Sequence, residues 1–393
     1  MDKKPKRMVP EVRFKGFTDD WEQRKLGELV TSYDTKRMPI RSEERMAGPY
    51  PYYGATGIID YVNNYIFDGK YLLLAEDGAN IIDRTAPITY LTNGKFWLNN
   101  HAHIMNSTKS NLVFLKATLD RKNYIKFNTG TAQPKLNAKI VANLKLNLPV
   151  LAEQDKISKV ISRIEIMIAL QQRKLKQLKQ LKKAMLQQLF VNDDSKLVPN
   201  TRFQGFVNNW KKGKLSENII EYKKKTTLNN QFPVLTSSRH GIFLQKEYYD
   251  GHQVASKNNI GYNIVPFGYF TYRHMSDDNI FKFNINILVP YGIVSTLYPV
   301  FSVKPNTNKY FVYYYLNYCN QMKRFALIQK QGGSRNYMYL SKLKQLQFVA
   351  PSLPEQTYVS DTLIQIDKIL SVYKTMLNQL NTIKKFLLQK LFI

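Results

Sequence analysis

Apolar residues near the end of the chain recur at alternating spacings of four and three, from Val359 to Leu380. Residues 151–192 show the same alternation. This spacing is the a/d repeat of a left-handed coiled coil. Acidic residues gather at the start of both stretches and lysines at their ends, as the helix dipole favours. Each stretch is therefore predicted to form one long helix.

The two helices are predicted to pack on each other, because a long helix with one apolar face is not stable alone. Gln171 interrupts the first seam, and a single polar residue at such a position can set the register. The predicted seam residues are Ile157, Ile161, Ile164, Ile168, Leu175, Leu178, Val359, Leu363, Ile366, Leu370, Leu377 and Leu380.

The chain also repeats itself, and internal repeats decide the architecture. A motif containing Arg13 and Trp21 recurs 189 residues later with Arg202 and Trp210. A second motif closes each half, as Pro-Val-Leu-Ala-Glu-Gln at 149–154 and Pro-Ser-Leu-Pro-Glu-Gln at 351–356, and its offset of 202 residues holds to the end of the chain. These repeated motifs form a duplicated frame, which indicates that the two halves of the chain share one structural role.

The middles of the two halves, 30–135 and 219–338, share only scattered residues. Short apolar runs between turns, such as 71–75 and 261–265, are typical of strands. The predicted fold is α+β: domains 1–150 and 193–352 are separated by helices 151–192 and 353–393. A pseudo-two-fold relation between the copies makes the helices antiparallel.

Charge narrows the class of partner. The chain has 58 Lys and Arg against 29 Asp and Glu, a net charge of +29, and such an excess favours a polyanion such as DNA. No apolar run of about 18 residues is present to span a membrane, and no signal peptide is expected at the start. The single cysteine, Cys319, is typical of a reducing cytoplasm.

Polar loops in the divergent middles are the candidates for contacting DNA, because Asn and Gln pair with adenine and Arg with guanine. An exposed loop residue without any DNA contact is an equally good interpretation of each. The candidates in the first half are Lys36, Arg37, Arg41, Asn80, Arg84, Asn99, Asn100, Thr131, Gln133 and Lys135. Those in the second half are Ser237, Ser238, Arg239, His240, Tyr272, Arg273, Gln331, Ser334, Arg335 and Asn336.

Motifs of nucleotide and cofactor chemistry are missing from the sequence. It has no G-x-x-x-x-G-K-[ST] phosphate loop and no G-x-G-x-x-G after a strand. It also lacks the Asn-Pro-Pro-aromatic or Asp-Pro-Pro-aromatic tetrapeptide of adenine methyltransferases. A zinc site is improbable with one cysteine, and the two-residue spacing of His101 and His103 does not by itself indicate a metal site. No catalytic or metal-binding residue is therefore expected in this chain.

Four features of the sequence resemble the specificity subunits of type I restriction-modification enzymes. They are the duplicated frame, the Glu-Gln motif at the start of both helices, the Leu-Phe motif at their ends, and the Leu-Leu-Leu-Ala-Glu-Asp-Gly-Ala-Asn segment at 72–80. The loop at 130–137 is also of the family type. The second copy instead carries Gly-Gly-Ser-Arg-Asn-Tyr-Met-Tyr-Leu at 332–340.

The resemblance implies a cytoplasmic, non-catalytic subunit that binds double-stranded DNA. Each target-recognition domain would read one half of a bipartite asymmetric site, and the helices would set the spacer. Two modification subunits using S-adenosylmethionine would methylate adenine, and restriction subunits driven by ATP with Mg²⁺ would translocate and cut. Two alternatives stay open: a stand-alone nuclease or methyltransferase, and a coiled-coil adaptor that only holds other proteins.

Overall fold

The computed structural model describes residues 7–130, 132–192, 196–250, 256–329 and 335–393. The chain divides into two compact units, Met1–Arg173 with Thr375–Ile393, and Lys174–Lys374. Each unit combines short strands with helices, and two helices of 38 residues each, α5 (Leu151–Gln188) and α10 (Leu353–Lys390), run through both. The mixed α+β fold and the two long helices predicted from the sequence are confirmed.

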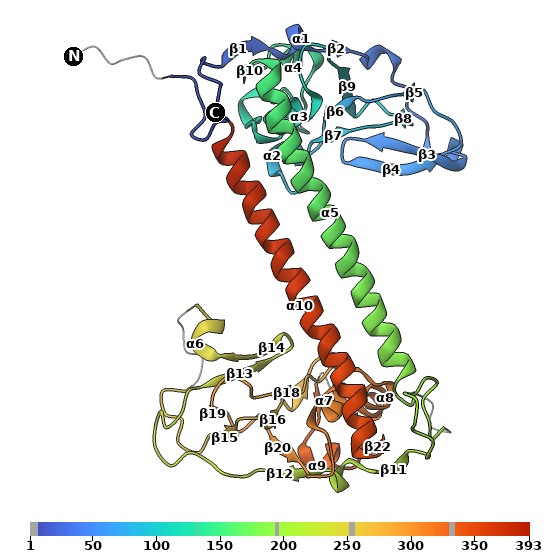
Figure 1. The fold of residues 1–393 in the computed structure, drawn as a ribbon, viewed down its shortest axis with the longest axis vertical. Helices are drawn as coiled ribbons and strands as arrows, with labels where there is room; N and C mark the ends of the chain where they lie inside the picture. The colour runs from blue at the N-terminus through green and yellow to red at the C-terminus, as the bar shows by residue number, and fades with distance from the viewer. Residues whose placement is uncertain (1–6, 131, 193–195, 251–255, 330–334) are drawn as a thin grey trace, which may run out of the picture. The chain divides into compact units, whose positions relative to one another are not determined.

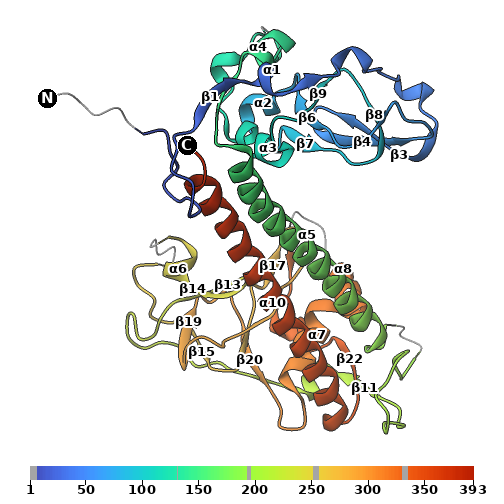
Figure 2. The same ribbon diagram turned by 45° about the horizontal axis from the view of Figure 1, so that its top comes forward.

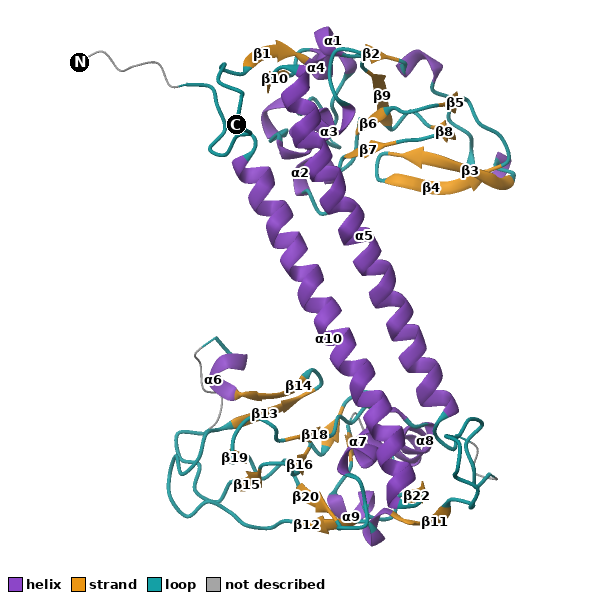
Figure 3. Ribbon diagram, viewed as in Figure 1, coloured by secondary structure: helices purple, strands orange, loops and turns teal. Residues whose placement is uncertain are grey.

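The first unit contains two four-stranded sheets, ordered β2-β9-β6-β7 and β4-β3-β8-β5, and a separate pair β1-β10. Figure 3 shows how short most of its strands are beside the long helix that follows. Its elements are β1 (Glu22–Lys25), α1 (Leu26–Leu29), β2 (Thr31–Ser32), η1 (Asp34–Lys36), η2 (Ser42–Glu44), β3 (Ala47–Gly54), β4 (Gly57–Val62), β5 (Phe67–Asp68), β6 (Leu72–Ala75), α2 (Asn80–Asp83), β7 (Thr89–Leu91), β8 (Lys95–Leu98), β9 (Ala102–Asn106), α3 (Leu112–Arg121), η3 (Ile125–Phe127), α4 (Ala138–Ala142) and β10 (Lys145–Leu148).

The second unit has one four-stranded sheet, ordered β12-β20-β16-β18, and four two-stranded pairs, β11-β22, β13-β14, β15-β19 and β17-β21. Its elements are β11 (Lys211–Lys214), η4 (Leu215–Glu217), β12 (Ile219–Glu221), β13 (Leu235–Ser238), β14 (Gly241–Leu244), α6 (Gln245–Tyr248), β15 (Asn263–Pro266), β16 (Phe270–Thr271), β17 (Met275–Ser276), β18 (Asn284–Ile285), β19 (Tyr291–Val294), β20 (Val300–Val303), α7 (Lys309–Tyr318), α8 (Asn320–Ile328), β21 (Asn336–Tyr337), α9 (Leu340–Leu343) and β22 (Gln347–Ala350).

The repeated motifs form the same buried contacts in both units. Arg13 donates two hydrogen bonds to Glu153, each 2.8 Å long, and Arg202 does the same to Glu355 at 2.8 and 2.7 Å. Both carboxylates are almost completely buried. A buried charge is tolerated only when it is paired and hydrogen-bonded, so these Arg–Glu pairs explain why the two motifs occur together.

The glutamine of each Glu-Gln motif fixes the start of the long helix. The Gln154 side chain donates to the Pro149 carbonyl at 2.9 Å and accepts from the backbone of Asn111, the N-cap of α3. Gln356 makes the same two contacts with Pro351 and with Asn308, the N-cap of α7. The motif therefore joins each long helix to the short helix of its own domain.

Each unit holds the beginning of one long helix beside the end of the other, so the pairing is antiparallel. In the first unit Lys384 of α10 pairs with Glu165 of α5 at 2.7 Å. In the second unit Lys182 of α5 pairs with Asp367 of α10. The two pairs correspond through the 202-residue repeat, because Glu165 matches Asp367 and Lys182 matches Lys384.

The end of each long helix completes the core of the unit that contains it. Leu391 and Phe392 pack among buried residues of the first domain, and Phe392 stacks on Phe114 with ring centroids 5.1 Å apart. Leu189 and Phe190 do the same in the second unit. Figures 1 and 2 both show the end of α10 beside the segment that precedes β1.

Within the described residues, neither the long helices nor the short ones are long and apolar enough to cross a membrane.

Candidate nucleic-acid interface

Three loops of the first unit meet where β6 ends and β9 begins in its β2-β9-β6-β7 sheet. Leu136 donates its backbone N–H to the Glu76 carbonyl at 2.7 Å, and Gly78 donates to the Pro134 carbonyl at 3.0 Å. Glu76 in turn donates its backbone N–H to the His101 carbonyl at 2.9 Å. The loop after β6, the turn before β9 and the 128–137 loop are thus tied together by backbone hydrogen bonds.

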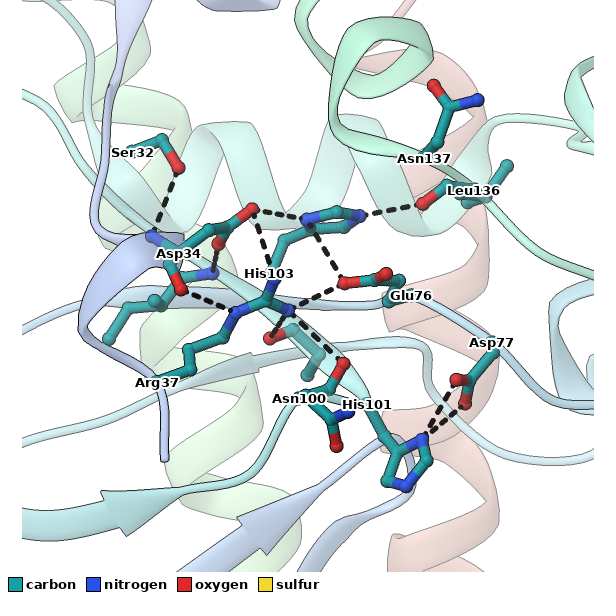
Figure 4. Close-up of polar contacts among 12 residues, drawn as sticks. Ser32, Asp34, Arg37, Glu76, Asp77, Asn100, His101, His103, Leu136 and Asn137 are labelled. Atoms are coloured by element: carbon teal, nitrogen blue, oxygen red, sulfur yellow. Dashed lines mark hydrogen bonds and ion pairs between the residues drawn. The ribbon is translucent and has the colours of Figure 1, made fainter. Parts of the chain in front are cut away.

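A network of charged side chains lies beneath these loops (Figure 4). The His103 ring donates to the Asp34 carboxylate through Nδ1 at 2.6 Å and to the Leu136 carbonyl through Nε2 at 2.7 Å. Arg37 donates to Glu76 at 2.6 Å and to the Ala102 carbonyl at 2.9 Å. Ion pairing therefore joins η1, the end of β6 and β9 into one assembly.

The charges in this network stabilise each other. Burial opposes ionisation of Asp34, but the hydrogen bond and charge of His103, the Ile104 backbone N–H and the charge of Arg37 lower its pKa below the usual value. An ionised carboxylate and a backbone carbonyl can only accept hydrogen bonds. Each His103 ring nitrogen therefore faces an acceptor, so the side chain bridges Asp34 and the Leu136 carbonyl.

The 128–137 loop is closed on itself by Asn128. The Asn128 Oδ1 accepts the backbone N–H groups of Gly130 and Lys135 at 2.9 and 2.8 Å. Asn137 then caps α4 by accepting the Ile140 N–H at 2.9 Å. Gln133 and Lys135 remain exposed at the tip, although Lys135 also lies 3.3 Å from Glu76.

The DNA-contact candidates of the first half separate into two groups. Lys36, Arg41, Asn100, Gln133 and Lys135 are exposed, and Thr131 lies outside the described residues. The side chains of Arg37, Asn80, Arg84 and Asn99 have partners inside the protein. This second group holds the loops in place.

The internal partners of the second group are specific. Asn80 accepts the Ala86 N–H at 2.9 Å and donates to the Ala86 carbonyl at 3.0 Å, which closes the turn after α2. Arg84 donates to the Lys122 carbonyl at 3.3 Å and lies over the Tyr124 ring. Asn99 is 5% exposed and accepts the His101 N–H at 2.9 Å.

In the second unit, Arg–Asp ion pairs form the polar edge in place of a histidine network. Arg239 forms a bidentate pair with Asp278 at 2.7 and 2.6 Å, and Arg335 pairs with Asp277 at 3.0 Å. The Arg239 hydrogen bond, with help from Ser276, lowers the pKa of Asp278 to about 2. A pocket of about 240 Å³ lies here, with Arg239 and Arg273 in its lining.

The candidates of the second half divide in the same way. Arg239, His240, Arg273 and Arg335 are exposed, whereas Gln331 and Ser334 lie outside the described residues. The remaining four have partners inside the protein, through the bonds Ser237 to Thr271, Ser238 to Gly241, Tyr272 to Met338 and Asn336 to Ala326. Tyr272 is fully buried.

Sequence reasoning missed Asp34 as a site residue and considered His103 only as an improbable metal ligand. The two residues are 69 positions apart and carry no local signal that they meet. Among the described residues no group of His, Cys, Asp and Glu is arranged to hold a metal ion.

The predicted seam residues are all among the less exposed positions of the long helices. Ile157, Ile161 and Leu178 of α5 are buried. Val359, Leu363 and Ile366 of α10 are buried too, and the other six predicted positions are partly exposed.

Comparison with solved structures identifies the fold. The crystal structure of the type I restriction-modification S subunit from M. genitalium superposes with a TM-score of 0.68 at 15% sequence identity, covering 98% of this chain and 99% of that one. The chain therefore has the fold of a type I specificity subunit.

Sequence comparisons find type I specificity subunits among the proteins that this chain resembles. Residues 18–180 match the type I restriction modification DNA specificity domain. A putative type I restriction enzyme specificity subunit of Haemophilus influenzae is 34% identical over 159 residues, 40% of each chain. A putative type I specificity subunit of Mycoplasma pneumoniae is 24% identical over 335 residues, 81% of each chain.

The match spans about two fifths of the Haemophilus influenzae relative and of the MjaVIII specificity subunit of Methanocaldococcus jannaschii. Residues 18–180 match the type I specificity domain, and the likeness of fold covers almost the whole chain. The resemblance to type I specificity subunits predicted from the sequence is confirmed.

Proposed function

We propose that this chain reads a bipartite DNA site, one half with each target-recognition domain, and that α5 and α10 set the unspecified gap between the halves. The supporting observation is that one repeated frame carries two unlike polar edges. The first is built on the His103 network and the closed 128–137 loop, and the second on exposed Arg–Asp pairs beside a pocket. Unlike edges on equivalent frames are suited to reading an asymmetric site.

The net charge of +29 supplies the sequence-independent part of binding. Lysine and arginine side chains that neutralise phosphates release counterions, so affinity falls steeply as salt rises. The exposed amide and guanidinium groups of the loops supply discrimination, because each mismatched base pair costs about 1–3 kcal/mol. Two half-sites multiply that discrimination.

Methylation and cleavage belong to partners under this proposal. Two modification subunits would use S-adenosylmethionine, and restriction subunits would use ATP and Mg²⁺. The purified chain, given all three compounds and DNA, is expected to show no methyl transfer and no strand cleavage. Turnover by the chain alone would favour the stand-alone enzyme instead.

Selection from random duplex DNA by the purified full-length chain tests the recognition role. The expected product is a motif of two different short sequences separated by a gap of constant length. Replacing residues 30–135 with the corresponding segment of another specificity subunit should change one half of the motif and leave the other half unchanged. A chain that enriches no sequence, or a replacement that changes nothing, would favour the adaptor.

A further inference from the structure

The His103 network consists of charged side chains that are largely buried. The side chains of Arg37 and Glu76 are each 13% exposed, that of Asp34 is 14% exposed and that of His103 is 3% exposed. Side chains on the same loops, such as Gln133 and Asn100, are exposed. The network is therefore placed to hold the loops and not to touch bases.

His103 holds the 128–137 loop through a single side-chain contact, the hydrogen bond from Nε2 to the Leu136 carbonyl. Its other nitrogen is anchored to Asp34, which is itself fixed by the Ile104 N–H at 2.8 Å. Glu76 lies 3.7 Å from the ring, and it also accepts from Arg37 and pairs with Lys135. These are the charged groups that surround the ring from η1, β6 and the loop.

We infer that His103 is a positioning residue for reading the first half-site: its Nε2–H, given to Leu136, sets the 128–137 loop so that Gln133 and Lys135 face the DNA. This inference rests on the proposed function. The Nε2–H group, which contacts the loop, is the donor that affects recognition. The Nδ1–H group, which contacts Asp34, anchors the ring within the domain.

The second unit gives an internal control. Of its histidines in the described part of the chain, His274 is the buried one, and its ring lies tilted against that of Tyr339 with centroids 4.9 Å apart. Its polar edge is fastened by Arg–Asp pairs. A change at His103 should therefore alter one half of the selected motif only.

Two substitutions separate the two ring nitrogens. A glutamine at this position can place its amide N–H near the position of Nε2, and an asparagine can place its amide near that of Nδ1. H103Q is expected to retain the first half of the motif, with discrimination within about threefold of the native chain. H103N should lose about tenfold or more of that discrimination, the effect of one hydrogen bond to a charged donor.

The experiment combines DNA selection with hydrogen exchange on the full-length native, H103Q and H103N chains. In H103N, exchange should increase in residues 128–137 while α3 stays protected and the second half of the motif stays unchanged. Equal losses in H103Q and H103N, unchanged discrimination in H103N, or faster exchange throughout α3 would each overturn the positioning role. If the native chain selects no motif, it is the proposed function that fails.

Discussion

Lys282 is a partly buried cation of the second unit that has aromatic neighbours in place of an acidic partner at close range. Its ammonium lies 4.9 Å from the Tyr318 ring centroid and 5.4 Å from that of Tyr313. Burial, and to a smaller extent the positive charge of Lys182, lower its pKa to about 8, and the negative charge of Asp367 partly opposes the shift. Aromatic faces stabilise a cation but do not replace its lost hydration.

Stability should depend on pH through this residue. Because the folded-state pKa of Lys282 lies below that of an unfolded lysine, the unfolded chain binds more protons above pH 8. The native chain should therefore gain about 1–3 kcal/mol relative to K282M between pH 8 and 10, since one pKa unit is worth about 1.4 kcal/mol. Urea unfolding of both chains across this range measures the difference.

K224M is the matched control, because Lys224 is exposed. The difference in free energy of unfolding between K224M and the native chain should not change between pH 8 and 10. A difference for K282M that does not vary with pH would contradict a lowered pKa for Lys282.

At the same scale, exposure separates the DNA-contact candidates that the sequence treats alike. Arg37 and Lys36 are neighbours of the same charge, yet Arg37 is bonded to Glu76 and three carbonyl groups whereas Lys36 is exposed. Apart from Asp34, these partners of Arg37 are 39 to 65 residues away. Residue type predicts which side chains are able to bind bases, but only the fold decides which of them are already occupied.

Helices α5 and α10 are the elements that periodicity predicts best. The apolar spacing of four and three is a local property of the chain, and the positions that follow it are buried or half-buried in both helices. The acidic residues at the helix starts have a second role that the pattern does not contain. Glu153 and Glu355 are buried partners of arginines 140 and 153 residues away, in addition to being favourable charges at helix N-termini.

Gln171 is the polar position in the seam of α5. Its Oε1 is buried and lacks a hydrogen-bond partner among the described residues. An unsatisfied buried polar atom costs about 1–3 kcal/mol. Q171L should therefore raise the free energy of unfolding of the first unit by about 1 kcal/mol, seen as a higher midpoint of denaturant unfolding.

The exposed neighbour Gln172 supplies the control, and Q172L should leave the midpoint unchanged. A lower midpoint for Q171L would mean that the amide stabilises the pairing of the helices, as a polar residue that sets register can do.

At the scale of the whole molecule, the division between the two compact units falls inside both long helices. Thr375–Ile393 belongs to the unit that holds the N-terminal domain, and residues 174–188 of α5 belong to the second unit. Phe392 is 5% exposed between Trp21 and Phe114, and Phe190 is 1% exposed against Phe311. Each domain is therefore completed by the end of a helix that begins in the other unit.

Removing the phenyl ring of Phe392 or of Phe190 should destabilise only the unit that contains it. F392A is expected to destabilise the first unit by about 3–5 kcal/mol, the usual cost of truncating a buried phenylalanine. Hydrogen exchange should then increase in α3 and β10 but not in α7 and β22. F190A is the reciprocal control and should give the opposite pattern, whereas loosening of both units by either substitution would contradict this division.

The sequence by itself determined the two long helices and the duplicated frame, since periodicity and repetition can be read along the chain without knowledge of distant contacts. It also determined the likeness to type I specificity subunits. The tertiary structure alone decided which loop side chains are exposed, and it brought Asp34, Glu76 and His103 together. These contacts join residues that are distant in the sequence, and their pairing depends on how β2, β6 and β9 align in one sheet.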